Sequence, residues 1–327
     1  MKVNIFVEDF SIFKYIGCAT AARTLYKGLL RQNPGDAIIK RNSKEKDFDV
    51  TSYHTFGPFA LNNRRKAKGI KVLSAHSTPR LNAGNVAFSR QFNSFYPKIY
   101  RKFDHIITIS EPSHREITEL LPGMDVTYIP NGIDREYFSF SMDKRKKFRE
   151  SYGIEDDDYV VLSVGQQVPR KGIYDFLELS LKSPERKFVW VGGYPYGMLS
   201  KEHGRIEKVK KSAGDNVIFT GVVDDISAAY SSGDVFLMPS YAESFGLVII
   251  EALSSGLPVI ARDIFEFREI FGDMVHLFRD RDDASAIIAD EGTLKISAKK
   301  ARESTKIYDI NLIADRHLTL YRELSGI

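Results

Sequence analysis

The feature that most constrains the fold of this chain is an alternation of short apolar runs with longer amphipathic stretches, which occurs twice along its 327 residues. In the first half, strands are predicted at residues 3–7, 71–75, 105–109 and 126–129, and helices at 19–30 and 113–121. In the second half, strands are predicted at residues 159–164, 187–191, 217–219, 235–238 and 258–261, and helices at 173–181, 227–232 and 245–254. Strands that alternate with helices indicate parallel sheets wound by crossover helices.

Two such series of similar size predict an α/β protein with two facing Rossmann-like domains and a cleft between them. The charged segment 143–158 separates the two series. We therefore expect an N-terminal domain over residues 1–142 and a C-terminal domain over residues 143–308. The last stretch, 309–327, contains an amphipathic helix over residues 312–324 that can pack on either domain.

Composition narrows the cellular setting. Cys18 is the single cysteine, so an internal disulfide is excluded and a reducing compartment is expected. No uncharged apolar run approaches the roughly 20 residues that span a bilayer. The first ten residues carry acids and lack the apolar core of a signal peptide. These features predict a cytoplasmic protein that can act at the cytoplasmic face of a membrane.

The net charge of +4 conceals a strong asymmetry between the two halves. Residues 1–150 contain 26 Lys or Arg and 15 Asp or Glu, whereas the remainder has a net charge of −7. Residues 50–103 hold ten basic residues and no acidic one. This distribution predicts a basic face on the first domain. Nucleic-acid binding is another interpretation of basic and aromatic sequence, but no nucleic-acid-binding motif supports it here.

The segment most informative about chemistry is residues 234–264. After a predicted strand, Glu243 precedes a helix, Ser244 is the expected N-cap, and Gly246 allows a ligand to approach the backbone. Glu251 lies two turns inside the helix. The free amides at a helix start and the helix dipole favour an anion there. The pattern therefore suits a phosphate at the helix tip, with carboxylates beside it to accept hydroxyl hydrogen bonds.

The frame ESFGLVIIEALSSGLPVI resembles the signature of retaining glycosyltransferases of family four, which have the two-Rossmann B-type fold. The resemblance implies that Glu243 contacts the donor sugar and that Glu251 holds the donor ribose hydroxyls. It also implies that amides around Phe245, Gly246 and Leu247 hold the diphosphate. Without this frame, Glu251 would be interpreted as part of an exposed helix face.

A second element, VGQQVPRKG, lies between a predicted strand and a helix and places Arg170 and Lys171 beside Gly172. Two cations at such a junction suit a diphosphate leaving group. The resemblance implies that Lys171 contacts the diphosphate. Gln166 stands where the family has an arginine, and Arg170 is a candidate to supply the missing charge.

Four further positions match the family pattern. His76, at the end of a predicted strand, matches a histidine that reaches the donor sugar, and His54 is a candidate to line the acceptor cleft. Gly17 matches a glycine near the donor phosphates, although Cys18 replaces a frequent second glycine. Val222 belongs to the loop expected to contact the nucleotide base. Residues 131–134 match an interdomain turn, which we interpret as structural.

Residues 87–103 combine aromatic and basic side chains at helical spacing, with Pro97 expected to kink or divide the helix. The apolar positions are Phe88, Phe92, Phe95, Ile99 and Phe103, and the basic ones are Arg90, Lys98, Arg101 and Lys102. One interpretation is an interfacial helix on anionic lipid, where these residues meet membrane or acceptor. The other is that the apolar stripe is core and the cations are its solvated face.

Together these features predict a retaining hexosyltransferase that uses a UDP-hexose donor, UDP-glucose or UDP-galactose, and a membrane glycolipid acceptor, within the group that builds diacylglycerol glycolipids. Glu243, His76 and Lys171 are the expected catalytic residues. No cofactor and no metal are expected, and the aspartate strings 156–158 and 280–282 are interpreted as solvated charge. The alternatives are transfer to a soluble or polyprenyl-linked saccharide, and a non-catalytic nucleotide-sugar-binding protein, which the departure at Gln166 makes credible.

Overall fold

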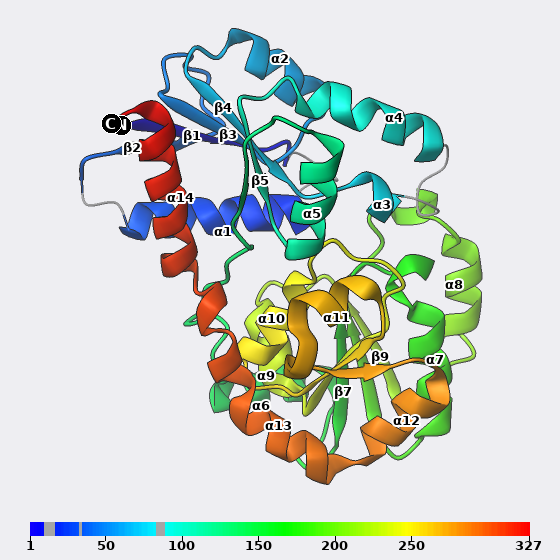
Figure 1. Cartoon of the computed structure of the whole chain (residues 1–327). Helices are drawn as coiled ribbons and strands as arrows, with labels where there is room; N and C mark the ends of the chain where they lie inside the picture. The colour runs from blue at the N-terminus through cyan, green and yellow to red at the C-terminus, as the bar shows by residue number, and fades with distance from the viewer. Residues whose placement is uncertain (10–16, 33–34, 83–88) are drawn as a thin grey trace. The chain divides into compact units, whose positions relative to one another are not determined.

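The computed structural model describes residues 1–9, 17–32, 35–82 and 89–327, with the side chains of 81–82 and 89–94 excepted. The chain divides into two compact units (Figure 1). The N-terminal unit comprises Met1–Asp134 together with Tyr308–Ile327, and the C-terminal unit comprises Arg135–Ile307. The last helix therefore belongs to the N-terminal unit.

The N-terminal unit is built on a six-stranded parallel sheet in the order β2-β1-β3-β4-β5-β6. Its strands are β1 (Lys2–Phe6), β2 (Ile38–Arg41), β3 (Val50–Tyr53), β4 (Ile70–Ala75), β5 (His105–Thr108) and β6 (Val126–Tyr128). Four of these strands lie where the apolar runs predicted them. Strands β2 and β3 were not predicted, because each has only four residues and polar side chains interrupt its apolar pattern.

Helices cover both faces of this sheet (Figure 1). They are α1 (Gly17–Gln32), α2 (Pro58–Lys66), α3 (Pro79–Asn82), α4 (Ser89–Tyr100), α5 (Glu111–Leu120) and α14 (Ile310–Ser325). Helices α1 and α14 share one core with the sheet, whereas α2, α4 and α5 share the core on the other face. Gly28 permits the close packing of α1 on α14, because a Cβ at this position would lie 2.5 Å from Cγ1 of Ile310.

The C-terminal unit has a second six-stranded parallel sheet, in the order β12-β11-β10-β7-β8-β9. Its strands are β7 (Val160–Val164), β8 (Lys187–Val191), β9 (Val217–Gly221), β10 (Val235–Met238), β11 (Val259–Arg262) and β12 (His276–Phe278). The strand order reverses between β7 and β10. Ligands of open parallel sheets bind beyond the carboxyl ends of the strands at such a switch point.

The helices of the C-terminal unit include several that the sequence analysis did not predict. They are α6 (Met142–Tyr152), α7 (Ile173–Lys182), α8 (His203–Lys210), α9 (Ile226–Ser232), α10 (Leu247–Ser254), α11 (Phe265–Phe271), α12 (Arg281–Ala289) and α13 (Glu291–Ser304). Short 3-10 helices are η2 (Pro169–Lys171), η3 (Gly197–Leu199), η4 (Gly272–Met274) and, at the junction of the units, η5 (Lys306–Tyr308). Helix α6 lies in the charged segment that we interpreted only as a separator. Its Arg149 is buried, where it pairs with Asp234 at 2.9 Å and donates to Ser232 O.

The two parallel sheets with their helical layers confirm the predicted α/β class with two Rossmann-like domains. In the part of the chain that the structure describes, no helix combines the length and apolar character needed to cross a bilayer.

Candidate active site

The switch point of the C-terminal unit brings together two loops that are distant in sequence. Strand β7 leads into η2, and β10 leads into residues 239–246 and then α10. The amine of Lys171 donates a hydrogen bond to Oε1 of Glu243, and Nη1 of Arg170 lies 3.5 Å from the same oxygen. Two cations and one carboxylate are thus gathered beyond the carboxyl edge of the sheet.

Backbone contacts fix these two loops against each other. Gly172 has φ +77°, and a Cβ there would lie 2.2 Å from the carbonyl oxygen of Pro239. The amide of Tyr241 donates to Arg170 O at 2.9 Å, and Nη1 of Arg170 donates to Ala242 O at 2.6 Å. Because only glycine fits this left-handed conformation and this close approach, Gly172 positions both cations.

Glu243 is buried, Lys171 and Arg170 are partly exposed, and the charges of the cluster stabilise one another. Burial by itself would raise the pKa of Glu243, but the charges of Lys171 and Arg170 outweigh burial and lower the pKa below its ordinary value. Burial lowers the pKa of Lys171, and the carboxylate of Glu243 offsets part of that effect. A phosphate that reaches Lys171 would compete with Glu243 for the amine, which would release the carboxylate for a hydroxyl group.

The start of α10 differs from the prediction. The helix begins at Leu247 with Gly246 as N-cap, and no side chain caps it, so the expectation that Ser244 is the N-cap is wrong. The physical reason is the φ of +96° at Gly246, a left-handed conformation that favours glycine. Phe245 is buried and packs against Phe271 with 6.0 Å between ring centroids. In the first turn of α10, the amide of Ile249 donates to Gly246 O at 2.9 Å. The first amides of a helix generally lack an acceptor within the helix and favour an anion.

Glu251 is a buried residue on α10. The hydroxyl of Tyr230 donates to Oε2 of Glu251 at 2.7 Å. Burial raises the pKa of Glu251 to about 7, although the bond from Tyr230 favours the charged form. The side chain is 8% exposed, so the interpretation as an exposed helix face is wrong.

Three glycines lie at or just beyond the carboxyl ends of β7, β8 and β9. A Cβ on Gly192, which has φ +125°, would lie 2.1 Å from the carbonyl oxygen of Gly165. The amide of Gly192 donates to Gly221 O at 2.8 Å. Val222, the next residue, has a side chain that is 61% exposed. These strand ends therefore present backbone and one apolar side chain to a ligand.

Gln166, which stands where the family has an arginine, forms a hydrogen bond through its backbone. The carbonyl oxygen of Gln166 accepts from the amide of Val168 at 2.9 Å. The neighbouring Gln167 donates to Gly192 O at 2.7 Å and accepts from Nζ of Lys210 at 3.1 Å. Arg170 and Lys171 therefore remain the cations that reach Glu243.

Sequence reasoning missed a buried support of the Glu243 loop. Nη2 of Arg262 donates to Oδ2 of Asp175 at 2.7 Å, and Nε of Arg262 donates to Pro239 O at 3.0 Å. The hydroxyl of Tyr241 donates to the same oxygen of Asp175 at 2.5 Å. Arg262 is the last residue of β11 and Asp175 lies in the first turn of α7, so no local motif joins them.

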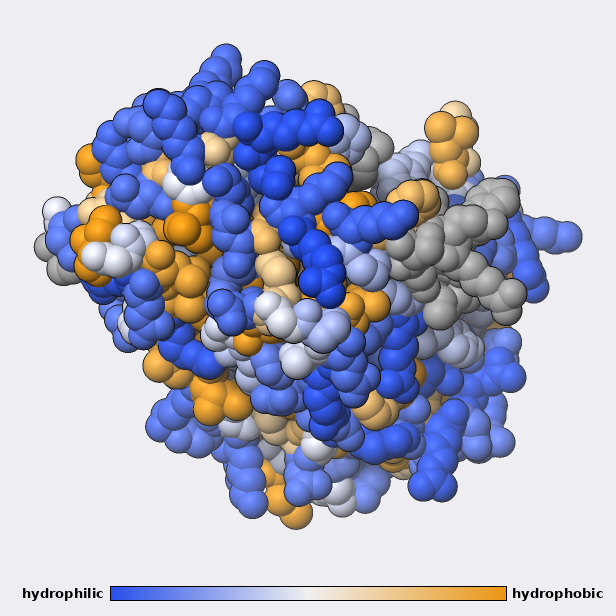
Figure 2. Space-filling model, turned by 45° about the horizontal axis from the view of Figure 1, so that its top comes forward, coloured by the Kyte–Doolittle hydropathy of each residue, from blue (hydrophilic) through white to orange (hydrophobic). Residues whose placement is uncertain are grey.

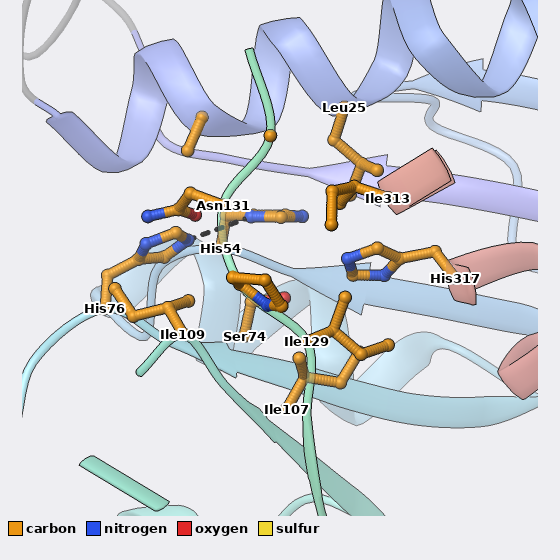
Figure 3. A pocket seen from close by; sticks show the side chains of 13 residues that line it. Leu25, His54, Ser74, His76, Ile107, Ile109, Ile129, Asn131, Ile313 and His317 are labelled. Atoms are coloured by element: carbon orange, nitrogen blue, oxygen red, sulfur yellow. Dashed lines mark hydrogen bonds between the residues drawn. The ribbon is translucent and has the colours of Figure 1, made fainter. Parts of the chain in front are cut away.

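In the N-terminal unit, His76 and His54 meet at the ends of adjacent strands β4 and β3. Nδ1 of His54 and Nε2 of His76 lie 3.0 Å apart (Figure 3). His54 is 4% exposed, so the expectation that it lines the acceptor cleft is wrong, whereas His76 is partly exposed. Burial lowers the pKa of His76 to about 4 and the pKa of His54 well below its ordinary value, so both rings are neutral.

Gly17 and Cys18 lie at the start of α1. Gly17 is the first residue of α1, and an added Cβ there would meet no atom within 4 Å. Cys18 is partly exposed, and burial of its thiol raises the pKa to about 11. The turn after β6 is structural: the amide of Ile133 donates to Tyr308 O at 2.8 Å, which ties this turn to the segment before α14.

The basic aromatic segment is divided between core and surface. Phe103 is buried, together with Tyr96 and Tyr100 of α4, whereas Phe95 is 52% exposed. Lys98, Arg101 and Lys102 are exposed. The side chains of Arg90 and Phe92 lie outside the described residues, as does Phe88. Helix α4 continues through Pro97 to Tyr100, so the proline does not divide it.

The basic side chains of α2 extend this surface. Arg64 lies with its guanidinium 5.7 Å from the ring centroid of Phe103, and Arg65 and Lys66 complete the last turn. Figure 2 shows a mainly hydrophilic surface on which the hydrophobic residues form small separate patches. The interpretation as core is therefore confirmed for Phe103, whereas contact of the exposed residues with membrane or acceptor stays a prediction.

The two aspartate strings have structural partners. Asp280 caps α12 by accepting from the amides of Asp282 and Asp283, each at 2.9 Å. Asp158 accepts from the amide of Glu155 at 2.8 Å.

Comparison with known proteins identifies relatives over nearly the whole chain. Residues 144–304 match the family described as Glycosyl transferases group 1, and residues 14–137 match Glycosyltransferase Family 4. The chain is 34% identical to a processive diacylglycerol alpha-glucosyltransferase of Acholeplasma laidlawii, over 81% of this chain and 79% of that protein. It is 25% identical to an alpha-galactosylglucosyldiacylglycerol synthase of Streptococcus pneumoniae, over 95% of this chain and 87% of that protein.

Solved structures share the fold. Anabaena Alr3699/HepE in complex with UDP-glucose superposes with a TM-score of 0.80 at 18% identity, covering 99% of this chain and 100% of that one. Sucrose-phosphate synthase of Thermosynechococcus elongatus superposes with a TM-score of 0.78 at 20% identity, covering 100% and 99%. Both similarities extend over both units of the chain.

Proposed function

Because the chain belongs to glycosyltransferase family 4 and has the B-type fold, we propose that it transfers a hexose from UDP-glucose or UDP-galactose to a hydroxyl group of a membrane glycolipid, with retention of the anomeric configuration. The observation that carries this proposal is the cluster of Lys171, Arg170 and Glu243 at the switch point of the C-terminal sheet. The names of the two diacylglycerol-glycolipid relatives support the class of acceptor.

In this proposal, the C-terminal unit binds the donor. The diphosphate contacts Lys171 and the amides at the start of α10, and Arg170 adds a second cation. Glu251 accepts hydrogen bonds from the ribose hydroxyls, and the loop of Val222 contacts the base. In the N-terminal unit, Gly17 lies near the donor phosphates and His76 contacts the donor sugar.

Chemistry then proceeds by electrostatic stabilisation of the leaving group. The bond between the anomeric carbon and the diphosphate oxygen breaks while the acceptor oxygen attacks the same face of the sugar. The acceptor proton passes to the leaving diphosphate, whose developing charge Lys171 and the helix amides stabilise. Glu243 and His76 orient the hexose. We propose that the reaction needs neither a metal nor a cofactor.

The acceptor proposal rests on the basic surface of α2 and α4 as well as on the relatives. Each Lys or Arg near an anionic surface contributes about 1 kcal/mol, so a handful of them suffices to localise a protein at the membrane. Exposed Phe95 beside Lys98 fits an interfacial contact. We therefore propose a peripheral association with the cytoplasmic face.

The decisive experiment is a turnover screen. UDP- and GDP-hexoses are incubated with diacylglycerol, glycosyl-diacylglycerol and oligosaccharide acceptors, with and without EDTA, and the anomer of the product is read by NMR. An α-linked glycolipid from a UDP-α-hexose, formed equally well in EDTA, supports the proposal. Transfer only to a soluble or polyprenyl-linked saccharide would show that the acceptor is a saccharide and not a membrane glycolipid. Donor binding without any transfer would favour a non-catalytic binding protein.

A further inference from the structure

The histidine pair of the N-terminal unit borders a small pocket. Its polar lining comes from His54, Ser74, His76, Asn131 and His317, and isoleucines of β5, β6 and α14 supply much of the rest (Figure 3). The pocket volume is about 10 Å³, which is room for about one water molecule. It therefore offers room for hydrogen bonding but none for a substrate.

Two buried atoms at this pocket have no protein hydrogen-bond partner: Nε2 of His54 and Oγ of Ser74. Buried polar atoms in folded proteins are almost always hydrogen-bonded, to protein or to ordered water. One water in the pocket can serve both atoms. Such a water would hold the ring of His54 from the side opposite His76.

The contact between the two rings restricts what His76 can do. A neutral imidazole has one donor nitrogen and one acceptor nitrogen. Because Nε2 of His76 is engaged with Nδ1 of His54, Nδ1 is the ring nitrogen that His76 has left for a substrate. The ring centroids lie 5.3 Å apart with planes inclined by 33°, so the two side chains are also packed against each other.

The remaining side of the pocket is closed by α14. His317 of this helix points into the pocket (Figure 3). Its Nδ1 lies 3.1 Å from the hydroxyl of Tyr321. His317 and His54 are both buried, so His76 is the partly exposed member of the three histidines. Besides burial, the two other histidines lower the pKa of His54.

We propose that His54 is a positioning residue for His76: its Nδ1, held by the pocket behind it, occupies Nε2 of His76 and so fixes the ring with Nδ1 presented to the substrate. This inference rests on the proposed function for the identity of that substrate. The geometry of the inference is independent of the proposed function, because all its residues lie within the N-terminal unit.

The test compares two substitutions at His54 that differ in which nitrogen they replace. The amide of Asn takes the place of Nδ1, whereas the amide of Gln takes the place of Nε2. We expect His54→Gln and His54→Leu to lower kcat by about tenfold or more, because a displaced group loses its alignment. His54→Asn should keep most of the wild-type kcat. UDP affinity should stay within about twofold in all three variants, because UDP is proposed to bind the C-terminal unit.

A second readout is independent of turnover. The ¹⁵N chemical shifts of the imidazole nitrogens of His76 report its tautomer, and we expect His54→Gln to change them while His54→Asn preserves them. His105 provides the matched control, since it is a buried histidine at the other end of the same sheet, with Nε2 2.9 Å from Oγ1 of Thr127. His105→Leu should leave both kcat and the His76 shifts unchanged.

The outcomes separate the two proposals. Equal kcat in the Asn and Gln variants, or unchanged His76 shifts in the Gln variant, would overturn the positioning role. If the wild-type protein transfers no hexose from any donor, the proposed function fails, and the NMR comparison alone then decides whether His54 sets the state of His76. If His54→Leu does not fold, the comparison of Asn with Gln still applies.

Discussion

The hydroxyl of Tyr230 donates a 2.7 Å hydrogen bond to Oε2 of Glu251, in the buried layer between α9 and α10. The partner of the Glu251 carboxyl group is thus a neutral hydroxyl. Because burial raises the pKa of Glu251 to about 7, the charge state of Glu251 changes within the physiological pH range. Two properties of the protein should depend on it, the stability of the fold and the affinity for the donor.

The first prediction concerns pH. Burial raises the pKa of Glu251 from 4.5 to about 7, so the folded protein binds this proton more tightly than the unfolded chain does. The contribution to the free energy of unfolding is therefore present below pH 4.5 and is lost as pH rises through 7, by about 3 kcal/mol. Denaturant titrations should show this component in the wild type and not in Glu251→Gln.

The same group should control donor affinity with the opposite sign. The carboxylate form accepts ribose hydroxyl bonds, so calorimetry should show UDP-glucose binding more tightly at pH 8 than at pH 6. Glu251→Gln should bind more weakly and without this pH dependence, and Tyr230→Phe should move the transition to higher pH. Wild-type affinity that does not vary over this range would contradict the role of Glu251.

The second prediction concerns the leaving group. Lys171→Met should lower kcat by about 10²–10³, because the amine stabilises charge that develops on the diphosphate. Lys182→Met, which removes an exposed cation from the same unit, should leave kcat unchanged. A Lys171 variant with full activity would refute the site assignment.

The third prediction tests the contact between the two donor loops. Gly172→Ala should destabilise the C-terminal unit strongly, since its Cβ would lie 2.2 Å from Pro239 O in addition to the strain of φ +77°. Gly153→Ala is the control: φ is +63°, an added Cβ meets nothing within 4 Å, and only the strain of about 1–2 kcal/mol remains. Thermal unfolding should rank the two variants in this order, and an equal loss of stability would argue against the close approach.

The fourth prediction concerns the support beneath Glu243. Asp175→Asn leaves Arg262 partly buried and without its carboxylate, which should lower the free energy of unfolding by about 3–5 kcal/mol and weaken UDP-hexose turnover. Asp282→Asn removes the carboxylate of an exposed pair and should change stability by less than about 1 kcal/mol. If the two variants were equally stable, the buried pair would not support the loop.

The fifth prediction concerns the membrane. Replacing Lys98, Arg101 and Lys102 by serine should reduce co-sedimentation with vesicles that contain anionic lipid at low salt, by about 1 kcal/mol per charge. The matched control replaces three exposed lysines of α13, Lys295, Lys299 and Lys300. Absence of wild-type binding to anionic vesicles at low salt would remove the membrane proposal, and an equal effect of the control would show that net charge alone is responsible.

Sequence periodicity predicted most of the scaffold but not all of it. Long apolar runs such as that of β8 are buried on both faces and stand out in any window. Strands β3 and β12 were not predicted, because polar side chains interrupt their short apolar patterns, and pairing with neighbouring strands stabilises them. The charged helix α6 carries few apolar side chains because it uses the buried guanidinium of Arg149 to bind backbone carbonyls.

By itself, the sequence determined the alternation of strands and helices, the family signature around Glu243, and the glycines at which helices and strands end. Only the tertiary structure decided which of these residues meet. Parallel strands return to the same edge of a sheet after long crossovers, so Lys171 reaches Glu243 across 72 residues and His54 reaches His76 across 22. Burial, which sets the pKa of Glu251 and hides His54, is likewise a property of the packed chain and of no local pattern.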